Sequence, residues 1–412
     1  MVPNSWCKGT IEDIAKVTSG GTPSRTKDSY WDGHIPWVTT SEVKLGVIAD
    51  TEQKITQEGL DNSSAKLFPK DTILMAMYGQ GKTRGQVAKL GIEASTNQAC
   101  AALLLHKEHD VEYYYQFLTS QYENIRELAN SGGQQNLSAG IIKDIHVPIP
   151  PLSEQRKIAK ILSTWDKAIA TTEKLIEASK QQKKALMQQL LTVRKRLVNP
   201  DTGKAFEGEW KEVKLSHLFD RVTEKNKGQS TNVVTISAQH GLIRQQEFFK
   251  KSVASETLDN YFILRKGQFA YNKSYSNGYP MGAIKRLNRY EDAVVTSLYI
   301  CFEIKDEAKT SSCFIEQYFE SGLLNRRLTK VAAEGGRAHG LLNVKPSDFM
   351  GLSLVVPTFD EQKKIASVLI AADKEIRVLE TKLAHFKQEK KALMQQLLTG
   401  KRRVKVDDME VA

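Results

Sequence analysis

The sequence lacks the features that mark several protein classes. It has only 4 cysteines in 412 residues, none in a C-x-x-C pair, which argues against a disulfide framework and a structural zinc site. No stretch approaches 18 uncharged apolar residues, which argues against a membrane span. The first residues lack a basic segment followed by an apolar one, so we expect no signal peptide and a cytoplasmic protein.

The motifs of catalysis are also missing. The 8 histidines are scattered without the spacing of metal ligands, and the acidic residues form no obvious nuclease cluster. An amino-methyltransferase would need an Asn- or Asp-Pro-Pro-aromatic motif, but the double proline Pro150-Pro151 is followed by Leu152. We therefore expect no catalytic residue, no metal site and no cofactor in this chain.

Positive charge is what the sequence has in excess. Lysine and arginine total 59 against 48 acidic residues, which gives a formal net charge of +11. Such a balance makes a polyanion, above all nucleic acid, the first partner to consider. The length predicts two or three domains.

An internal repeat organises the chain. Residues 154–192 align without gaps on residues 361–399, and the run Lys183 to Thr192 recurs letter for letter as Lys390 to Thr399. Both copies carry apolar residues in alternating steps of four and three, which predicts long helices that pair as a coiled coil. The positions of this seam are Ile158, Leu162, Trp165, Ile169, Thr172, Ile176, Ser179, Lys183, Leu186 and Leu190 in the first copy, and Ile365, Leu369, Ala372, Ile376, Leu379, Leu383, Phe386, Lys390, Leu393 and Leu397 in the second.

The linker between the first helix and the second globular region limits how the helices can pair. A helix of 39 residues is about 58 Å long. A linker of roughly 17 residues reaches at most about 56–61 Å, which leaves no slack for a return along the helix. We therefore predict an antiparallel two-helix coiled coil with a pseudo-twofold axis.

The globular region before each helix contains short alternating segments and helical stretches, which predicts a mixed α/β domain. The expected strands are Thr72 to Met77, Ala99 to Leu105 and Ala293 to Phe302, and the expected helices are Val111 to Asn130 and Ser311 to Val331. The predicted fold class is α+β. Its parts are a first globular domain (1–152), a first helix (153–193), a linker (194–210), a second globular domain (211–359), a second helix (360–400) and a tail (401–412).

Several segments of the chain match a known family. They are VPIPPLSEQRKIA at 147–159, its echo VVPTFDEQKKIA at 355–366, SGGTPSR at 19–25, GHIPWVT at 33–39, YNKS at 271–274 and HGLLN at 339–343. On these segments the chain resembles, over essentially its full length, the specificity subunit of type I restriction–modification enzymes.

The resemblance implies that each globular region is a target-recognition domain that reads one half of a gapped, double-stranded DNA sequence. It also implies that the helices are spacers that bind two modification subunits, which use S-adenosylmethionine to methylate adenines. Separate restriction subunits would use ATP and magnesium to translocate and cut DNA. This chain would supply specificity and no chemistry, and no membrane partner is expected.

A glycine-rich segment in the first globular region has two interpretations. Residues 76–83 (AMYGQGKT) fit a relaxed Walker A spacing, but a phosphate loop needs a helix directly afterwards, and the residues that follow favour a strand. The better interpretation is a basic loop that contacts DNA, with an ordinary polar hairpin as the alternative. Its candidate contact residues are Gln80, Lys82, Thr83, Arg84 and Gln86.

The other candidate DNA contacts lie in polar segments with aromatic or glycine neighbours. The glycine pairs Gly132-Gly133 and Gly335-Gly336 permit a close backbone approach to DNA, or they end helices. The candidates beside them are Gln134, Gln135, Asn136, Arg337 and His339. The remaining candidates are Arg25 in the first globular region and Arg244, Tyr271, Asn272, Lys273 and Ser274 in the second.

Two other functions compete with this interpretation. A nucleotide-binding enzyme would use residues 76–83, and a coiled-coil adaptor would only bridge proteins.

Overall fold

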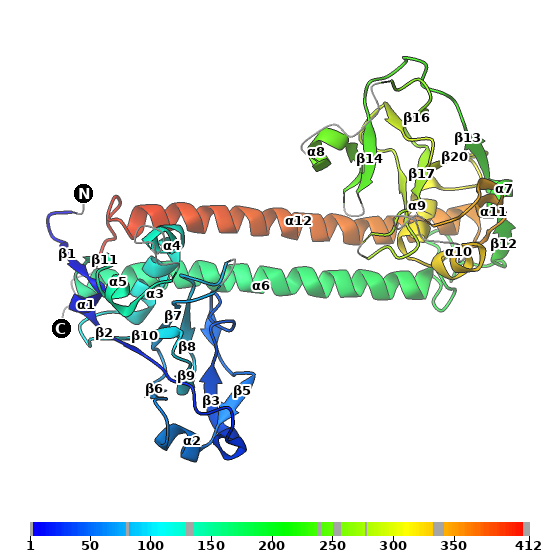
Figure 1. The fold of residues 1–412 in the computed structure, drawn as a ribbon. Coiled ribbons are helices and arrows are strands. Elements are labelled where there is room, and N and C mark those ends of the chain that lie inside the picture. Colours follow the sequence, from blue (N-terminus) through cyan, green and yellow to red (C-terminus); the bar gives the residue numbers. More distant parts are fainter. Residues whose placement is uncertain are drawn as a thin grey trace. The chain divides into compact units, whose positions relative to one another are not determined.

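The structure of the chain is a computed structural model, which describes residues 3–79, 82–128, 136–237, 240–249, 257–276, 278–332 and 342–406. The chain divides into two compact units (Figure 1). The first unit combines Met1–Lys174 with Thr381–Ala412, and the second is Leu175–Glu380. Each unit therefore holds one globular region and a part of each of two long helices, α6 (Leu152–Leu190) and α12 (Phe359–Leu397).

The globular region of the first unit is a mixed α/β structure. A five-stranded sheet has the order β2-β10-β7-β8-β4, a four-stranded sheet has the order β5-β3-β9-β6, and β1 pairs antiparallel with β11. The strands are β1 (Cys7–Thr10), β2 (Ala15–Ser19), β3 (Trp31–Val38), β4 (Val47–Ile48), β5 (Gln53–Ile55), β6 (Leu67–Phe68), β7 (Ile73–Ala76), β8 (Val87–Leu90), β9 (Ala94–Thr96), β10 (Cys100–Leu105) and β11 (His146–Ile149). The helices are α1 (Ile11–Ile14), the 3-10 turn η1 (Asp28–Tyr30), α2 (Gln57–Asp61), α3 (Val111–Ser120), α4 (Tyr122–Leu128) and α5 (Ala139–Lys143).

The globular region of the second unit is also mixed. A four-stranded sheet has the order β13-β20-β17-β18, and three antiparallel ribbons are β12-β21, β14-β15 and β16-β19. The strands are β12 (Lys211–Lys214), β13 (Phe219–Val222), β14 (Val234–Ser237), β15 (Gly241–Arg244), β16 (Phe262–Arg265), β17 (Phe269–Asn272), β18 (Ala283–Arg286), β19 (Asp292–Val295), β20 (Ile300–Ile304) and β21 (Ser353–Val356). The helices are α7 (Leu215–Leu218), α8 (Gln245–Phe249), α9 (Ser312–Glu320), α10 (Asn325–Val331) and α11 (Pro346–Met350).

The central strands β7 and β17 are apolar runs because side chains on both of their faces enter a core. In β7, Ile73 and Met75 enter a core that also contains Ile158 of α6, whereas Leu74 and Ala76 enter a separate core on the other face. In the second unit, β17 divides in the same way. Its Phe269 and Tyr271 pack in the core that includes Ile365 and Leu369 of α12, and Ala270 packs on the other side. Each globular region thus shares one hydrophobic core with the long helices.

The two long helices pair antiparallel, as the linker length predicted. In the first unit, Asp166 of α6 contacts Lys390 of α12, and Glu173 contacts Lys387. Residue numbers thus rise along α6 as they fall along α12. In the second unit the pairs are Lys180–Glu380 and Lys183–Asp373. All the predicted seam positions are buried or half-buried, which confirms the register of the repeat.

A buried glutamine attaches each globular region to its long helix. Gln155 accepts a hydrogen bond from the amide of Asp110 at 2.8 Å and donates one to the carbonyl of Pro150 at 2.8 Å. Gln362, its equivalent in the repeat, accepts from the amide of Ser311 at 2.9 Å and donates to Pro357. Asp110 and Ser311 are themselves the N-caps of α3 and α9. The glutamines therefore link the N-cap of α3 to α6 and that of α9 to α12.

Three expected elements are each divided in the structure. The helix expected from Val111 breaks at Gln121 into α3 and α4, and the one expected from Ser311 breaks near Gly322, whose φ of +75° cannot continue a helix. The strand expected from Ala293 to Phe302 is two strands, β19 and β20, in different sheets. A turn at Thr296 separates them, and its carbonyl accepts a hydrogen bond from the amide of Tyr299 at 3.1 Å.

Candidate nucleic-acid interface

Each globular region presents a β-hairpin that is bonded to a residue distant in the sequence. In the first unit the hairpin joins β7 to β8, and the amide of Leu137 donates to the carbonyl of Met77, just past β7, at 3.0 Å. In the second unit the hairpin joins β17 to β18, and the amide of Leu342 donates to the carbonyl of Lys273, just past β17, at 3.0 Å. These two bonds hold Leu137 at the end of β7 and Leu342 at the end of β17.

The first hairpin carries the candidates Lys82, Thr83, Arg84 and Gln86. Lys82 is exposed, whereas the other three are half-buried. The hydroxyl of Tyr122 in α4 donates to the carbonyl of Lys82 at 2.6 Å, which fixes the loop to the helix behind it. Gln80 lies outside the described residues.

The hairpin does not have the form of a phosphate loop. Strand β8 begins at Val87, directly after the candidate residues, and the amide of Gln86 donates to the carbonyl of Thr83 in a tight turn at 3.0 Å. A phosphate loop needs a helix N-terminus at this place. The strand that the sequence predicted is present, so the nucleotide-binding alternative finds no support.

The glycine segments are described only at their ends. Asn136 is exposed and directly precedes Leu137, the residue that bonds to the first hairpin. The candidates Gln134, Gln135, Arg337 and His339 lie outside the described residues.

The second hairpin mixes core and surface positions. Tyr271 is 0% exposed, stacks on Phe349 with ring centroids 5.0 Å apart, and donates its hydroxyl to the carbonyl of Met281 at 2.8 Å. Its ring is therefore a core contact, and burial raises the pKa of its hydroxyl. Asn272, Lys273 and Ser274 are half-buried.

Local contacts orient these three polar residues. The side-chain oxygen of Asn272 accepts from the amide of Ser274 at 3.0 Å, and Nζ of Lys273 lies 3.5 Å from the carbonyl of Val344. Burial lowers the pKa of Lys273.

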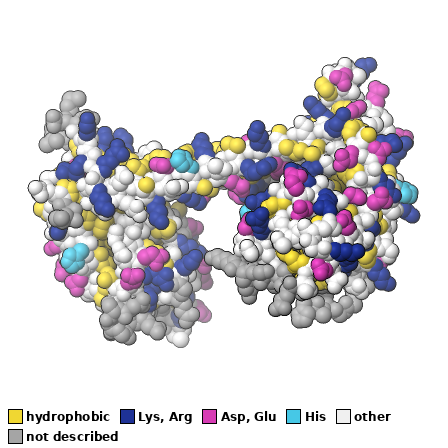
Figure 2. Space-filling model, turned by 90° about the horizontal axis from the view of Figure 1, so that it is seen from above, with side chains coloured by type: hydrophobic (Ala, Val, Ile, Leu, Met, Phe, Trp, Pro, Cys, Tyr) yellow, Lys and Arg dark blue, Asp and Glu magenta, His cyan; other side chains and the backbone are white. Residues whose placement is uncertain are grey.

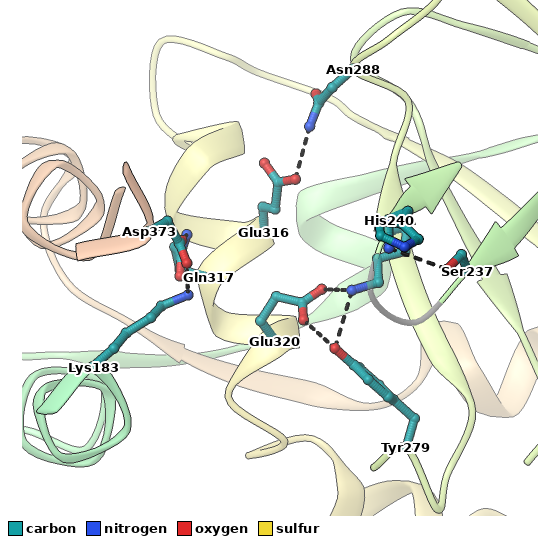
Figure 3. A network of polar contacts seen from close by, with 10 residues as sticks. Lys183, Ser237, His240, Tyr279, Asn288, Glu316, Gln317, Glu320 and Asp373 are labelled. Atoms are coloured by element: carbon teal, nitrogen blue, oxygen red, sulfur yellow. Dashed lines mark hydrogen bonds and ion pairs between the residues drawn. The ribbon is translucent and has the colours of Figure 1, made fainter. Parts of the chain in front are cut away.

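A lysine with little exposed surface links the second strand of each hairpin to a helix. In the first unit, Lys89 of β8 pairs with Glu112 of α3 at 2.5 Å. In the second unit, Lys285 of β18 pairs with Glu320 of α9. The hydroxyl of Tyr279 donates a hydrogen bond to the carboxylate of the same Glu320 at 2.7 Å (Figure 3). Burial, with the nearby carboxylate of Glu320, raises the pKa of Tyr279. The hairpins therefore project from rigid bases.

Arg25 lies on an aromatic platform. Its guanidinium carbon is 3.8 Å from the ring centroid of Trp31 and 5.1 Å from that of Trp37. The indole nitrogens of these tryptophans donate to the carbonyls of Ser24 and Gly21, each at 3.0 Å, which fixes the loop that carries Arg25. Stacking orients the plane of the exposed guanidinium and leaves its N–H edge available to phosphate or a base.

Arg244 is exposed at the end of β15. Its Nε donates to the side-chain oxygen of Asn232 at 3.1 Å, and its guanidinium lies 5.3 Å from the ring of Tyr290. It thus resembles Arg25 as a cation held against an aromatic ring.

Two exposed tyrosines were missed as candidates. Tyr78 beside the first hairpin is 42% exposed, and Tyr275 beside the second is 65% exposed. Large aromatic rings at such positions can stack on bases or sugars. Each stands in a glycine-containing or polar stretch without strand alternation, and that context was the available signal.

Charges of both signs lie on the face of the molecule that Figure 2 shows. On the face that Figure 2 shows, Lys and Arg side chains alternate with acidic ones over the globular regions and the long helices. Within the described ranges, no group of three His, Cys, Asp or Glu side chains could hold a metal ion. No helix of the described part of the chain has the length and apolar character needed to cross a membrane.

Several known proteins similar to this chain are components of type I restriction systems. A family model described as "Type I restriction modification DNA specificity domain" matches residues 3–181. The type I restriction enzyme MjaVIII specificity subunit of Methanocaldococcus jannaschii is 26% identical over 420 residues, which cover 98% of this chain and 94% of the relative. The EcoR124I/EcoR124II specificity subunit of Escherichia coli is 29% identical over 163 residues, which cover 38% of this chain and 40% of the relative.

Solved structures share the fold along almost the whole chain. The type I restriction–modification S subunit from M. genitalium has a TM-score of 0.59 at 16% identity, with 97% of this chain and 98% of the other covered. The HsdS subunit from Thermoanaerobacter tengcongensis has a TM-score of 0.51 at 14% identity, with the same coverage of both chains.

Proposed function

We propose that the chain, which is similar along nearly its whole length to type I restriction enzyme specificity subunits, selects the DNA sequence on which partner subunits act. It would read a bipartite, gapped target in double-stranded DNA, one half-site with each globular region. Its own role is non-catalytic. Adenine methylation and DNA cleavage would be carried out by the partners.

The repeated bond between a hairpin and a residue distant in the sequence supports this function most directly. Each unit bonds the residue after its glycine segment to the residue just past a central strand, Leu137 to Met77 and Leu342 to Lys273. A duplicated frame thus offers two sets of loop side chains, and two readers are what a bipartite target requires.

The two sets of side chains differ in chemistry. The first hairpin carries Lys82 and Arg84, which can contact phosphates or guanine edges, and the second carries Asn272 and Ser274, which can pair with base edges. Because the readers are unlike, the two half-sites would differ and the target would be asymmetric.

The partners follow from the same proposal. Two modification subunits would bring S-adenosylmethionine, and restriction subunits would bring ATP and magnesium. The protein would work in the cytoplasm, together with the DNA that it reads.

Selection from random DNA tests this function. The chain, co-purified with its modification subunit, is incubated with a pool of random duplexes, and the bound duplexes are sequenced. We expect enrichment of one motif with two specified parts and an unspecified gap. Recovery of unselected sequences with a salt-dependent affinity alone would support a coiled-coil adaptor and contradict the proposal.

A further inference from the structure

The two units pack the seam between α6 and α12 differently. In the first unit, Trp165 and Phe386 meet edge to face with ring centroids 5.5 Å apart. The repeat places Ala372 at the position equivalent to Trp165 and Ser179 at the position equivalent to Phe386. The second unit therefore has two small side chains where the first has two aromatic rings.

This difference leaves a groove in the second unit. Its volume is about 220 Å³, and Ser179 and Ala372 contribute to its walls. The other lining residues are Gln182, Lys183, Leu186, Val368, Ala371 and Glu375. The same place in the first unit is occupied by the chain's own aromatic pair, so the fold itself shows what kind of side chain the groove accommodates.

Two exposed apolar side chains lie one helical turn from groove-lining residues of the second unit, and we call these two positions the rim. Leu175, one turn before Ser179, is 50% exposed, and Val378, one turn after Glu375, is 58% exposed. Their equivalents in the first unit are Lys382 and Thr171. Exposed large apolar side chains next to an unfilled groove are typical of protein interaction sites.

The charges of the groove favour a protein over a nucleic acid. Nζ of Lys183 lies 2.6 Å from the carboxylate of Asp373, and the hydroxyl of Ser179 donates to Glu375 at 3.4 Å. One paired cation and one carboxylate give no excess of positive charge to attract phosphate.

We propose that this groove receives an aromatic side chain from a helix of a modification subunit, with Leu175 and Val378 packing against the apolar face of that helix. An aromatic side chain that fills a pocket is a common anchor of such contacts. The first unit cannot offer the same site, because Trp165 and Phe386 fill it. Each chain would thus have one such site, and its two modification subunits would be held unequally. The inference rests on the proposed function.

Filling the groove tests the inference. The double variant Ser179→Phe/Ala372→Trp copies the packing of the first unit into the second. The chain and the variant are titrated with the purified modification subunit, and the complexes are followed by native mass spectrometry. We expect one of two modification subunits to bind at least tenfold more weakly, with no fall in the melting temperature of the variant.

A second pair of variants separates docking from folding. Leu175→Lys/Val378→Thr changes only the rim to the residues of the first unit. It should weaken the binding of the same modification subunit. Thr171→Val/Lys382→Leu makes the opposite change in the first unit and should leave binding as it is, because Trp165 and Phe386 occupy the place equivalent to the groove.

The outcomes distinguish the inference from the proposed function. If the unmodified chain binds two modification subunits and both the filled and the rim variants bind them equally well, the groove is only a packing gap and the inference fails. If the unmodified chain binds no modification subunit, the proposed function fails and the inference fails with it.

Discussion

Nζ of Lys390 in α12 lies 2.6 Å from the carboxylate of Asp166 in α6, and Nζ of Lys183 in α6 lies 2.6 Å from the carboxylate of Asp373 in α12. The repeat thus preserves an ion pair in space as well as in sequence, with each helix supplying the lysine once and the aspartate once. A frame with this exchange of roles is what an antiparallel pair of similar helices requires.

The aspartates also attach the globular regions to the helices. The side-chain amide of Gln116 in α3 donates to Asp166 at 2.6 Å, and that of Gln317 in α9 donates to Asp373 at 2.8 Å (Figure 3). We predict that Asp166→Ala and Asp373→Ala each lower the free energy of unfolding by about 1–3 kcal/mol, because each leaves a lysine and a glutamine without their shared acceptor. Urea unfolding of both variants measures this. A loss of stability in only one of the two variants would contradict the structural equivalence of the two ion pairs.

Arg196 and Arg403, which occupy equivalent positions of the repeat, should contribute unequally to the stability of the fold. Arg196 donates to the side chain of Glu361, which is 1% exposed, whereas Arg403 pairs with Glu154, which is 7% exposed and also accepts the indole N–H of Trp6 at 3.3 Å.

Arg196→Met strands a buried carboxylate, so we predict a loss of about 3 kcal/mol of unfolding free energy. Arg403→Met should cost less, since Glu154 keeps one donor. Thermal unfolding of the two variants decides this, and an equal or reversed order would count against the account.

The first hairpin should act on one half-site alone. Replacing Lys82 and Arg84 together with alanine removes the basic groups of the β7–β8 loop. We predict roughly tenfold or greater weakening of DNA binding and a shallower salt dependence, because phosphate and base contacts are lost. The matched variant in the second hairpin is Asn272→Ala/Ser274→Ala. Base preferences at the two half-sites are measured by competition with DNA altered in one half, and equal losses at both halves would contradict independent readers.

The stacking of Arg25 should matter beyond its charge. Arg25→Lys keeps the cation but removes the planar group that lies 3.8 Å from the ring of Trp31. We predict a loss of about 1–2 kcal/mol in binding to one half-site, since an ammonium cannot make a bidentate contact. Fluorescence anisotropy with the selected duplex measures the change. Binding as tight as that of the unmodified chain would remove Arg25 from the interface.

The long helices were predictable from the sequence, and the globular regions only in outline. The seam is a local 3.5-residue period, so every position could be read without knowing the fold. The pairing of β1 with β11 joins Cys7 to Ile149, and no local pattern sets such a distant register.

The buried ring of Tyr271 shows the same limit at the candidate site. The polar residues after it suggested a surface stretch, but Tyr271 is the last inward-facing position of β17 and packs on Phe349. Alternation within the short strand Phe269–Asn272 was the signal. This alternation could not be recognised in the sequence, because the four-residue strand is followed directly by polar loop residues.

Mapping of adenine methylation across the genome of host cells, with and without this gene, tests the central claim most directly. The account predicts that deletion abolishes methylation at one gapped, two-part motif and leaves other methylation as it was. Unchanged methylation, in cells that express the modification subunit, would contradict the assignment of this chain as the subunit that selects the DNA.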